Sequence, residues 1–217
     1  MINNPVVLDK NEINLIESKI NSPLFKSESW SDDDLKELKT KIKTHYIQTQ
    51  NYECPYCKQI IRSTHGRNWD IEHIISRFQE KNFMFEPENL CVSCVDCNSR
   101  KSNKKSTSSN AKVRLPKNSK DYLIVHPHFD NYKDFILVIK AGFYYVALEK
   151  KGEKTIEVCG LNRFYEFADY NDDVADDNHI LLLADELSKT TDVLIKNKIR
   201  SELAYLAIQG NMTCAQN

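Results

Sequence analysis

Cysteine is the residue type best placed to do chemistry in this chain, because five of its seven cysteines lie between positions 54 and 97. Cys54 and Cys57 form one Cys-x-x-Cys pair, and Cys91, Cys94 and Cys97 offer two overlapping pairs with the same spacing. Each pair can present two thiolates to one ion, and two pairs complete a tetrahedral zinc site. The spacing therefore predicts a structural zinc ion held by Cys54, Cys57 and two of the three later cysteines.

Three short motifs follow one another around the second group of cysteines. They are WDIEH at 69–73, NL at 89–90 and CVDCNSRK at 94–101. An acid and a histidine at the end of an apolar strand, an asparagine opening a second strand, and a cysteine pair opening a helix resemble the HNH endonuclease family, the ββα-metal fold. The resemblance covers about residues 51–105. It selects Cys94 and Cys97 over Cys91, since the family's second cysteine pair directly precedes the helix asparagine.

The resemblance implies a set of roles in phosphodiester hydrolysis. His73 is the candidate general base, because a histidine near its unperturbed pKa of ~6.5 can take a proton from water at neutral pH. Glu72 and Asn98 would supply oxygen ligands to a catalytic Mg²⁺ or Mn²⁺ ion, and Asp70 shares the strand face of Glu72 as a further ligand or supporting group. Asn89 would orient the base and its loop. Asn98 replaces the histidine of many relatives, which favours Mg²⁺ or Mn²⁺ over softer metals.

Charge is distributed unevenly along the chain, although the formal net charge is only -1. The stretch 97–120 contains eight basic residues and no acid, and its Ser-, Asn- and Lys-rich composition predicts a basic loop. Arg100, Lys101 and Lys104 at its start are expected to contact nucleic-acid phosphates without reading sequence. The stretch 164–188 has eight acids and no lysine or arginine, which is typical of a solvated face and would also suit a docking surface.

Hydrophobic periodicity predicts the elements that position these residues. Helices are expected at 9–20 and 31–50, before the first cysteine pair. Segments rich in aromatic and β-branched residues predict a three-stranded meander formed by 134–140, 143–150 and 155–158. Apolar spacing over 178–209 predicts one long helix or two shorter ones.

The expected fold class is therefore α+β, with a ββα-metal core stapled by a four-cysteine zinc site. We expect three parts: an N-terminal helical segment at 1–50, a nuclease core with its basic loop at 51–120, and the meander with C-terminal helices at 121–217.

Composition excludes several other classes of protein. The chain is 41% hydrophobic and 28% charged, which suits a globular protein with a buried core. Its longest apolar runs fall far short of the ~20 residues that span a bilayer, and its first residues lack a secretory signal. No membrane association and a cytoplasmic location are therefore expected.

A looser likeness extends beyond the core. WDIEH at 69–73, EPENL at 86–90 and GEKTIEVCGLNR at 152–163 are similar to compact HNH effectors of bacterial anti-phage systems, such as the PtuB type of Septu and some retron systems. This likeness implies a nucleic acid substrate, DNA more than RNA, and a protein partner such as an ATPase. Two other functions stay open, a non-catalytic zinc-dependent nucleic-acid-binding module and a protein-interaction subunit.

Overall fold

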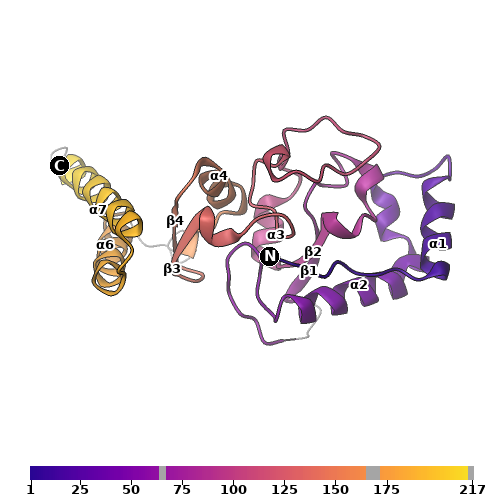
Figure 1. Cartoon of the computed structure of the whole chain (residues 1–217), viewed down its shortest axis with the longest axis horizontal. Coiled ribbons are helices and arrows are strands. Elements are labelled where there is room, and N and C mark those ends of the chain that lie inside the picture. The colour runs from indigo at the N-terminus through magenta and orange to yellow at the C-terminus, as the bar shows by residue number, and fades with distance from the viewer. Residues whose placement is uncertain (64–66, 165–171, 215–217) are drawn as a thin grey trace.

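The structure, a computed structural model, describes residues 1–63, 67–164 and 172–214. Its strands form two antiparallel pairs, β1 (Trp69–His73) with β2 (Leu90–Cys94) and β3 (Ile136–Lys140) with β4 (Tyr144–Ala147). The longer helices are α1 (Lys10–Ile20), α2 (Lys36–Thr49), α3 (Val95–Lys101), α4 (Lys150–Cys159), α6 (Asp172–Lys189) and α7 (Val193–Cys214). Figure 1 shows α1 and the α6–α7 hairpin at opposite ends of the molecule, with the β1–β2 pair between them.

The two N-terminal helices begin where local hydrogen bonding directs them. Asp9 caps α1 by accepting from the backbone N–H groups of Asn11 and Glu12, and the Glu12 side chain accepts in return from the Asp9 N–H. The predicted helix at 31–50 begins later, at Lys36, because Asp32 has an extended backbone that separates two short 3-10 turns. The structure therefore confirms both helices but moves the start of the second one.

The β1–β2 pair and α3 form the centre of the fold. Trp69 pairs with Cys94 and His73 with Leu90, so the loop between the strands spans residues 74–89. All five residues of β2 are buried, and α3 follows at once with Cys94 as its N-cap. This direct junction places the first turn of α3 beside β1.

The prediction of a third strand at 155–158 is wrong, because these residues belong to α4. Thr155, Val158 and Cys159 are buried and recur at the three- and four-residue spacing of a helix face. The helix ends at Cys159 and is capped by Gly160, whose φ of 56° is the left-handed conformation that favours glycine at this position. The meander is thus a two-stranded hairpin followed by a helix.

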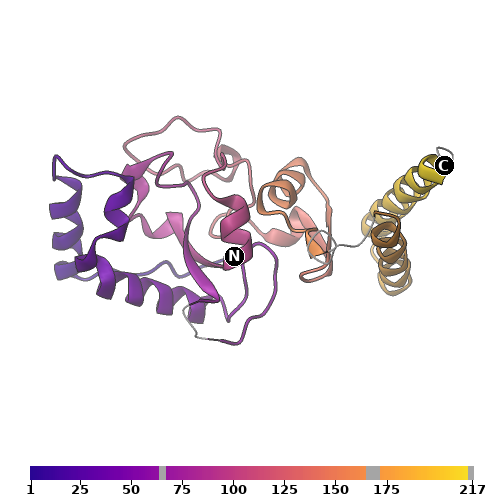
Figure 2. The same ribbon diagram turned by 180° about the vertical axis from the view of Figure 1, so that it is seen from behind.

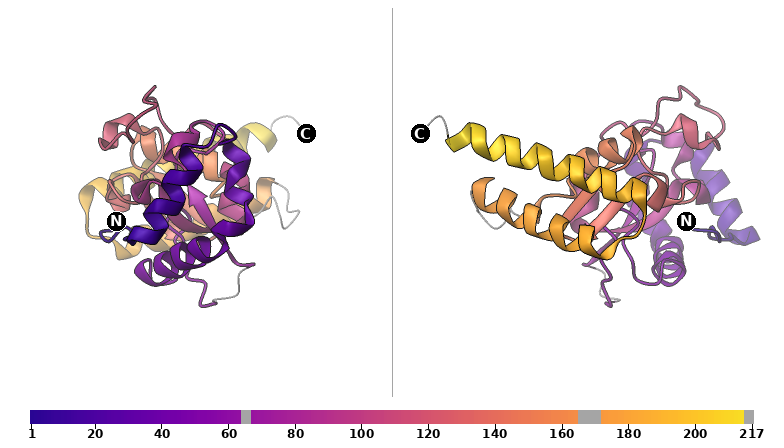
Figure 3. Two further views of the ribbon diagram at one scale, coloured as in Figure 1. Left: turned by 90° about the vertical axis from the view of Figure 1, so that its right-hand side faces the viewer. Right: turned by 60° about the vertical axis from the view of Figure 1, so that its left-hand side comes forward.

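In the part of the chain that the structure describes, buried apolar side chains form two clusters. The larger one runs from Ile2 to Leu161 and crosses positions 50 and 120, the boundaries of the three-part division, which itself stays a prediction. The smaller cluster joins Tyr144 and Val146 of β4 to side chains of α6 and α7. Figures 2 and 3 show these two helices side by side beyond the β3–β4 pair.

Within the described residues, no helix combines the length and the apolar character that crossing a membrane requires.

Candidate active site and metal centre

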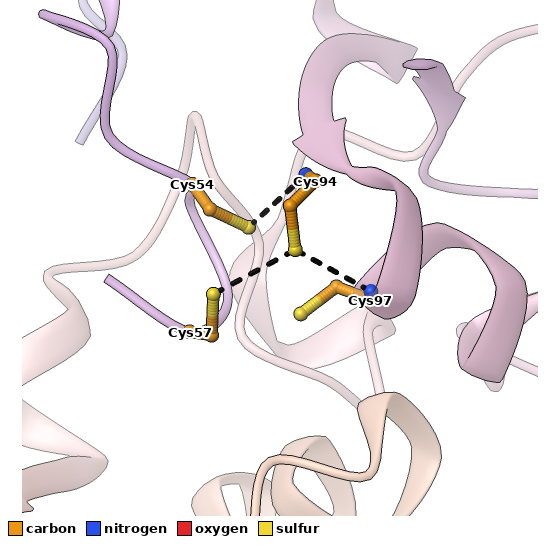
Figure 4. Close-up of side chains that lie close together, drawn as sticks. All are labelled: Cys54, Cys57, Cys94 and Cys97. Atoms are coloured by element: carbon orange, nitrogen blue, oxygen red, sulfur yellow. Dashed lines mark hydrogen bonds between the residues drawn. The ribbon is translucent and has the colours of Figure 1, made fainter. Parts of the chain in front are cut away.

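The four-cysteine cluster is the candidate metal centre. The sulfur atoms of Cys54, Cys57, Cys94 and Cys97 lie within 4.8 Å of one another, and all four residues are buried. Figure 4 shows the first two on a loop and the other two at the junction of β2 and α3. Four soft donors gathered around one point fit a tetrahedral zinc ion with Zn–S bonds of ~2.3 Å. Cys91 is buried on β2 outside this cluster.

The surroundings of the sulfur atoms favour the thiolate form that binds zinc. The Cys94 N–H lies 3.5 Å from Cys54 Sγ, and the Arg163 guanidinium lies 3.6 Å from Cys97 Sγ. Hydrogen bonds from the neighbouring thiols lower the pKa of Cys94, and the same neighbours raise the pKa of Cys97. Adjacent thiolates repel one another, so all four can ionise together only around a positive ion.

A cavity of about 270 Å³ opens beside the end of β1. Glu72 and His73 of β1 line it together with Asn98 of α3 and residues 76–78 of the following loop. Asn98 lies next to β1 because α3 follows β2 directly and β2 pairs with β1. In the sequence, β1 and α3 are separated by the 74–89 loop and β2. Three of the site residues predicted from sequence thus face one cavity.

His73 has a defined tautomer in this cavity. Its Nε2 lies 3.1 Å from the carbonyl oxygen of Met84. Because a carbonyl oxygen only accepts, Nε2 must carry the hydrogen, and Nδ1 has the free lone pair. The ring is 5% exposed and packs edge-on against Trp30, with centroids 4.5 Å apart. Burial lowers the pKa of His73 to about 3, well below the ~6.5 expected from the sequence, so the ring is neutral at neutral pH but its free Nδ1 is a weaker base than an unperturbed histidine.

Lys101 does not reach the surface, so the prediction that it contacts phosphate is wrong. Its side chain is 0% exposed, and its Nζ lies 2.5 Å from Oε1 of Glu72, which is 3% exposed. The same Nζ donates to the carbonyl oxygen of His73 at 2.9 Å. Burial raises the pKa of Glu72, while Lys101 and the Tyr56 hydroxyl, 3.2 Å away, act in the opposite direction. Lys101 therefore fixes the positions of both the Glu72 carboxylate and the last residue of β1, His73.

Asn89 is fully buried behind the cavity and joins the two ends of the 74–89 loop. Its Oδ1 accepts from the N–H of Ile75 at 2.7 Å, and its Nδ2 donates to the carbonyl oxygens of Ile75 and Phe83, both at 3.0 Å. Phe83 directly precedes Met84, the hydrogen-bond acceptor of His73. The side chain of Asn89 thus determines where that acceptor lies.

Asp70 and Asn98 interact at the edge of the cavity. The Nδ2 of Asn98 donates to Oδ2 of Asp70 at 2.8 Å, which leaves the amide oxygen of Asn98 able to bind a cation. The carboxylate of Glu72 lies on the cavity wall. Carboxylate and amide oxygens are the donors that Mg²⁺ and Mn²⁺ prefer, so this donor set fits the predicted catalytic ion.

Arg100 and Lys104 face α4 rather than the cavity. The aliphatic part of Arg100 packs on Gly160, and Lys104 Nζ lies 3.3 Å from the carbonyl oxygen of Val158. Among the described residues, the cavity lining includes neither of them. Their contact with phosphate stays a prediction.

Arg77 is a candidate functional residue that the sequence analysis missed. It lines the cavity, its guanidinium lies 4.9 Å from the ring centroid of Phe78, and its Nε is buried without a hydrogen-bond partner in the described part of the chain. The only signal in the sequence is its position in the loop that leaves β1, shortly after His73.

Comparison with known proteins defines the class of this region. Residues 54–104 match the family model of the HNH endonuclease domain. The match contains the four cysteines, β1, β2 and α3, and it covers less than half of the 217-residue chain. No curated protein and no solved structure matches the chain. The chain thus carries an HNH endonuclease domain with a four-cysteine cluster.

Proposed function

We propose that this protein is a metal-dependent endonuclease that hydrolyses phosphodiester bonds of nucleic acid. The observation that supports it most is the convergence of Glu72, His73 and Asn98 on one cavity within the HNH domain. A zinc-binding module without catalysis would not need a neutral imidazole beside a carboxylate and an amide.

In this proposal His73 acts as the general base. Its Nδ1 takes a proton from the attacking water, while the Nε2–H bond to Met84 keeps the ring in place and accommodates the positive charge that develops. Asn89 is a positioning residue, since it fixes the loop that contains this carbonyl group.

The two metal sites have different tasks. A divalent ion held by Glu72, Asn98 and Asp70 would supply a Lewis acid for the phosphate and the leaving oxygen. Zinc in the four-cysteine cluster would serve as a scaffold, joining the loop before β1 to the start of α3.

A plasmid-nicking assay in Mg²⁺ and in Mn²⁺ tests the enzyme proposal. We expect His73→Ala to lower the cleavage rate by about 10²–10⁴, the usual contribution of a general base. His45→Ala is the matched control, because His45 lies on α2 and bonds the carbonyl oxygen of Asn4 away from the cavity. Equal cleavage by the wild type and His73→Ala would exclude His73 as the general base, and no cleavage by the folded wild type in either metal would favour the non-catalytic module.

We further propose DNA as the preferred substrate and a role in anti-phage defence with an ATPase partner. Both parts rest on the sequence likeness, and the acidic stretch proposed for docking includes 165–171, which lie outside the described residues. Parallel cleavage of DNA and RNA of one sequence tests the first part. Phage plating on cells with wild-type protein or His73→Ala, each with its neighbouring gene, tests the second.

A further inference from the structure

A second groove continues from the cavity along α2. Its α2 wall consists of Lys36, Lys39, Thr40 and Lys43. Their spacing of three, four and seven residues places all four side chains on one face of the helix. The other wall consists of Trp30, Asp70, Ile71, Arg77 and Asn98. We call this the α2 groove. Ile71, Arg77 and Asn98 line both the cavity and the groove, so the two are continuous.

The α2 groove is positively charged. Its lining contains three lysines and Arg77 against the single carboxylate of Asp70. Lys36 is exposed, and in the described part of the chain neither Lys36 nor Lys39 forms an ion pair with a carboxylate. Lys39 Nζ donates to the carbonyl oxygen of Trp30 at 3.0 Å and keeps further donors.

On the other flank of α2, the lysine charge is compensated by a carboxylate. Lys41 lies 2.5 Å from the carboxylate of Glu12, so its charge is compensated within the protein. Lys36 and Lys39 therefore lie on the flank of α2 that lines the groove, and Lys41 lies on the other flank.

Arg77 stands where the groove meets the cavity. Its buried Nε–H has no acceptor among the described residues, and leaving a buried donor without an acceptor is unfavourable. The ring of Phe78 supports the guanidinium from one side. A phosphate oxygen at the junction would satisfy the free donor and match the guanidinium charge.

We propose that the α2 groove binds the sugar-phosphate backbone of the nucleic acid that flanks the bond to be cleaved. The proposal rests on the proposed function, because the groove begins at the proposed catalytic cavity. α2 lies before residue 54, outside the region that matches the HNH domain. Lys36 and Lys43 are about 10 Å apart along the helix axis, which corresponds to about three phosphates of one duplex strand.

Salt-dependent binding tests the groove directly. The variant Lys36→Gln/Lys39→Gln/Lys43→Gln is compared with the wild type for binding of a fluorescein-labelled DNA duplex and the RNA duplex of the same sequence, in Ca²⁺. Loss of two or three phosphate contacts should reduce the slope of log K against log salt by about 2–3. Affinity at low salt should fall at least tenfold for both nucleic acids.

The matched control removes three exposed lysines elsewhere, Lys10→Gln/Lys133→Gln/Lys150→Gln. The change in net charge is the same, and none of the three lines the cavity or the groove. We expect a salt slope close to that of the wild type. The single substitution Lys36→Glu, at an exposed position, should weaken binding in the same direction as the triple variant.

Cleavage of two substrates separates the groove from the proposed function. The Lys36→Gln/Lys39→Gln/Lys43→Gln variant, called the α2 variant, should hydrolyse the small ester bis(p-nitrophenyl) phosphate like the wild type, yet cleave plasmid more slowly. Wild-type cleavage with unchanged binding by the α2 variant would overturn the groove alone. A wild type that cleaves neither substrate, with binding still lost in the α2 variant, would overturn the nuclease proposal and leave the groove supported.

Discussion

Replacing Lys101 with methionine should destabilise the protein strongly, because it leaves a carboxylate buried without its counter-charge. Glu72 is 3% exposed and would keep only the Tyr56 hydroxyl as a neutral donor. Removing one member of a buried ion pair costs about 3–5 kcal/mol, whereas methionine fills much of the space of the lysine stem. We therefore expect Lys101→Met to lose about this much free energy of unfolding.

Equilibrium urea unfolding at pH 7 in the presence of zinc measures this loss. The double variant Lys101→Met/Glu72→Gln should recover most of it, since the glutamine is neutral and can still accept from Tyr56. Lys189→Met is the matched control, because the ion pair of Lys189 with Asp185 has the same 2.5 Å distance but is 63% and 58% exposed. Its unfolding midpoint should be close to that of the wild type.

Two results would refute this reasoning. A midpoint for Lys101→Met equal to that of Lys189→Met would show that the buried pair contributes little. A double variant no more stable than Lys101→Met would show that the lost packing of Lys101, and not the uncompensated charge of Glu72, causes the loss.

Three further expectations concern the scaffold. Cys97→Ser should lower the zinc content measured by mass spectrometry and the thermal midpoint, while Cys91→Ser keeps the metal; the reverse result would show the wrong ligand set. Gly152→Ala should destabilise by about 1–3 kcal/mol in urea unfolding, because its Cβ would lie 1.9 Å from the carbonyl oxygen of Phe135; an unchanged midpoint would contradict this close approach. Burial lowers the pKa of His126 well below its usual value, so the folded protein keeps the ring neutral while the unfolded chain binds a proton below pH ~6.5. Stability should thus fall as the pH drops below 6.5, and His126→Asn should reduce that slope by up to about 1.4 kcal/mol per pH unit; identical slopes would exclude His126 as the cause.

Local chemistry made part of this structure predictable. The Cys-x-x-Cys pairs and the alternation of β1 depend on spacing alone, so a four-cysteine site and the position of His73 at a strand end could be inferred from sequence. The choice of Cys94 and Cys97 over Cys91 needed the resemblance to the HNH family. The helix after Asp9 follows from a capping box, which involves only neighbouring residues. Short apolar runs such as 155–158 suit a strand or a helix equally well, so α4 was not predictable from its pattern.

The amino-acid sequence by itself determined which side chains could bind metal and which could accept a proton, because those properties depend on residue type and local spacing. Only the tertiary structure decided which charges face outward. Lys101 follows a surface-like pattern yet lies beneath β1, since α3 packs against that strand and brings Nζ to Glu72. Lys36, Lys39 and Lys43 of α2 line the α2 groove because Leu38 and Ile42 fix the rotation of the helix by packing in the core. Burial of a charge depends on the whole fold around it, and no local pattern records that.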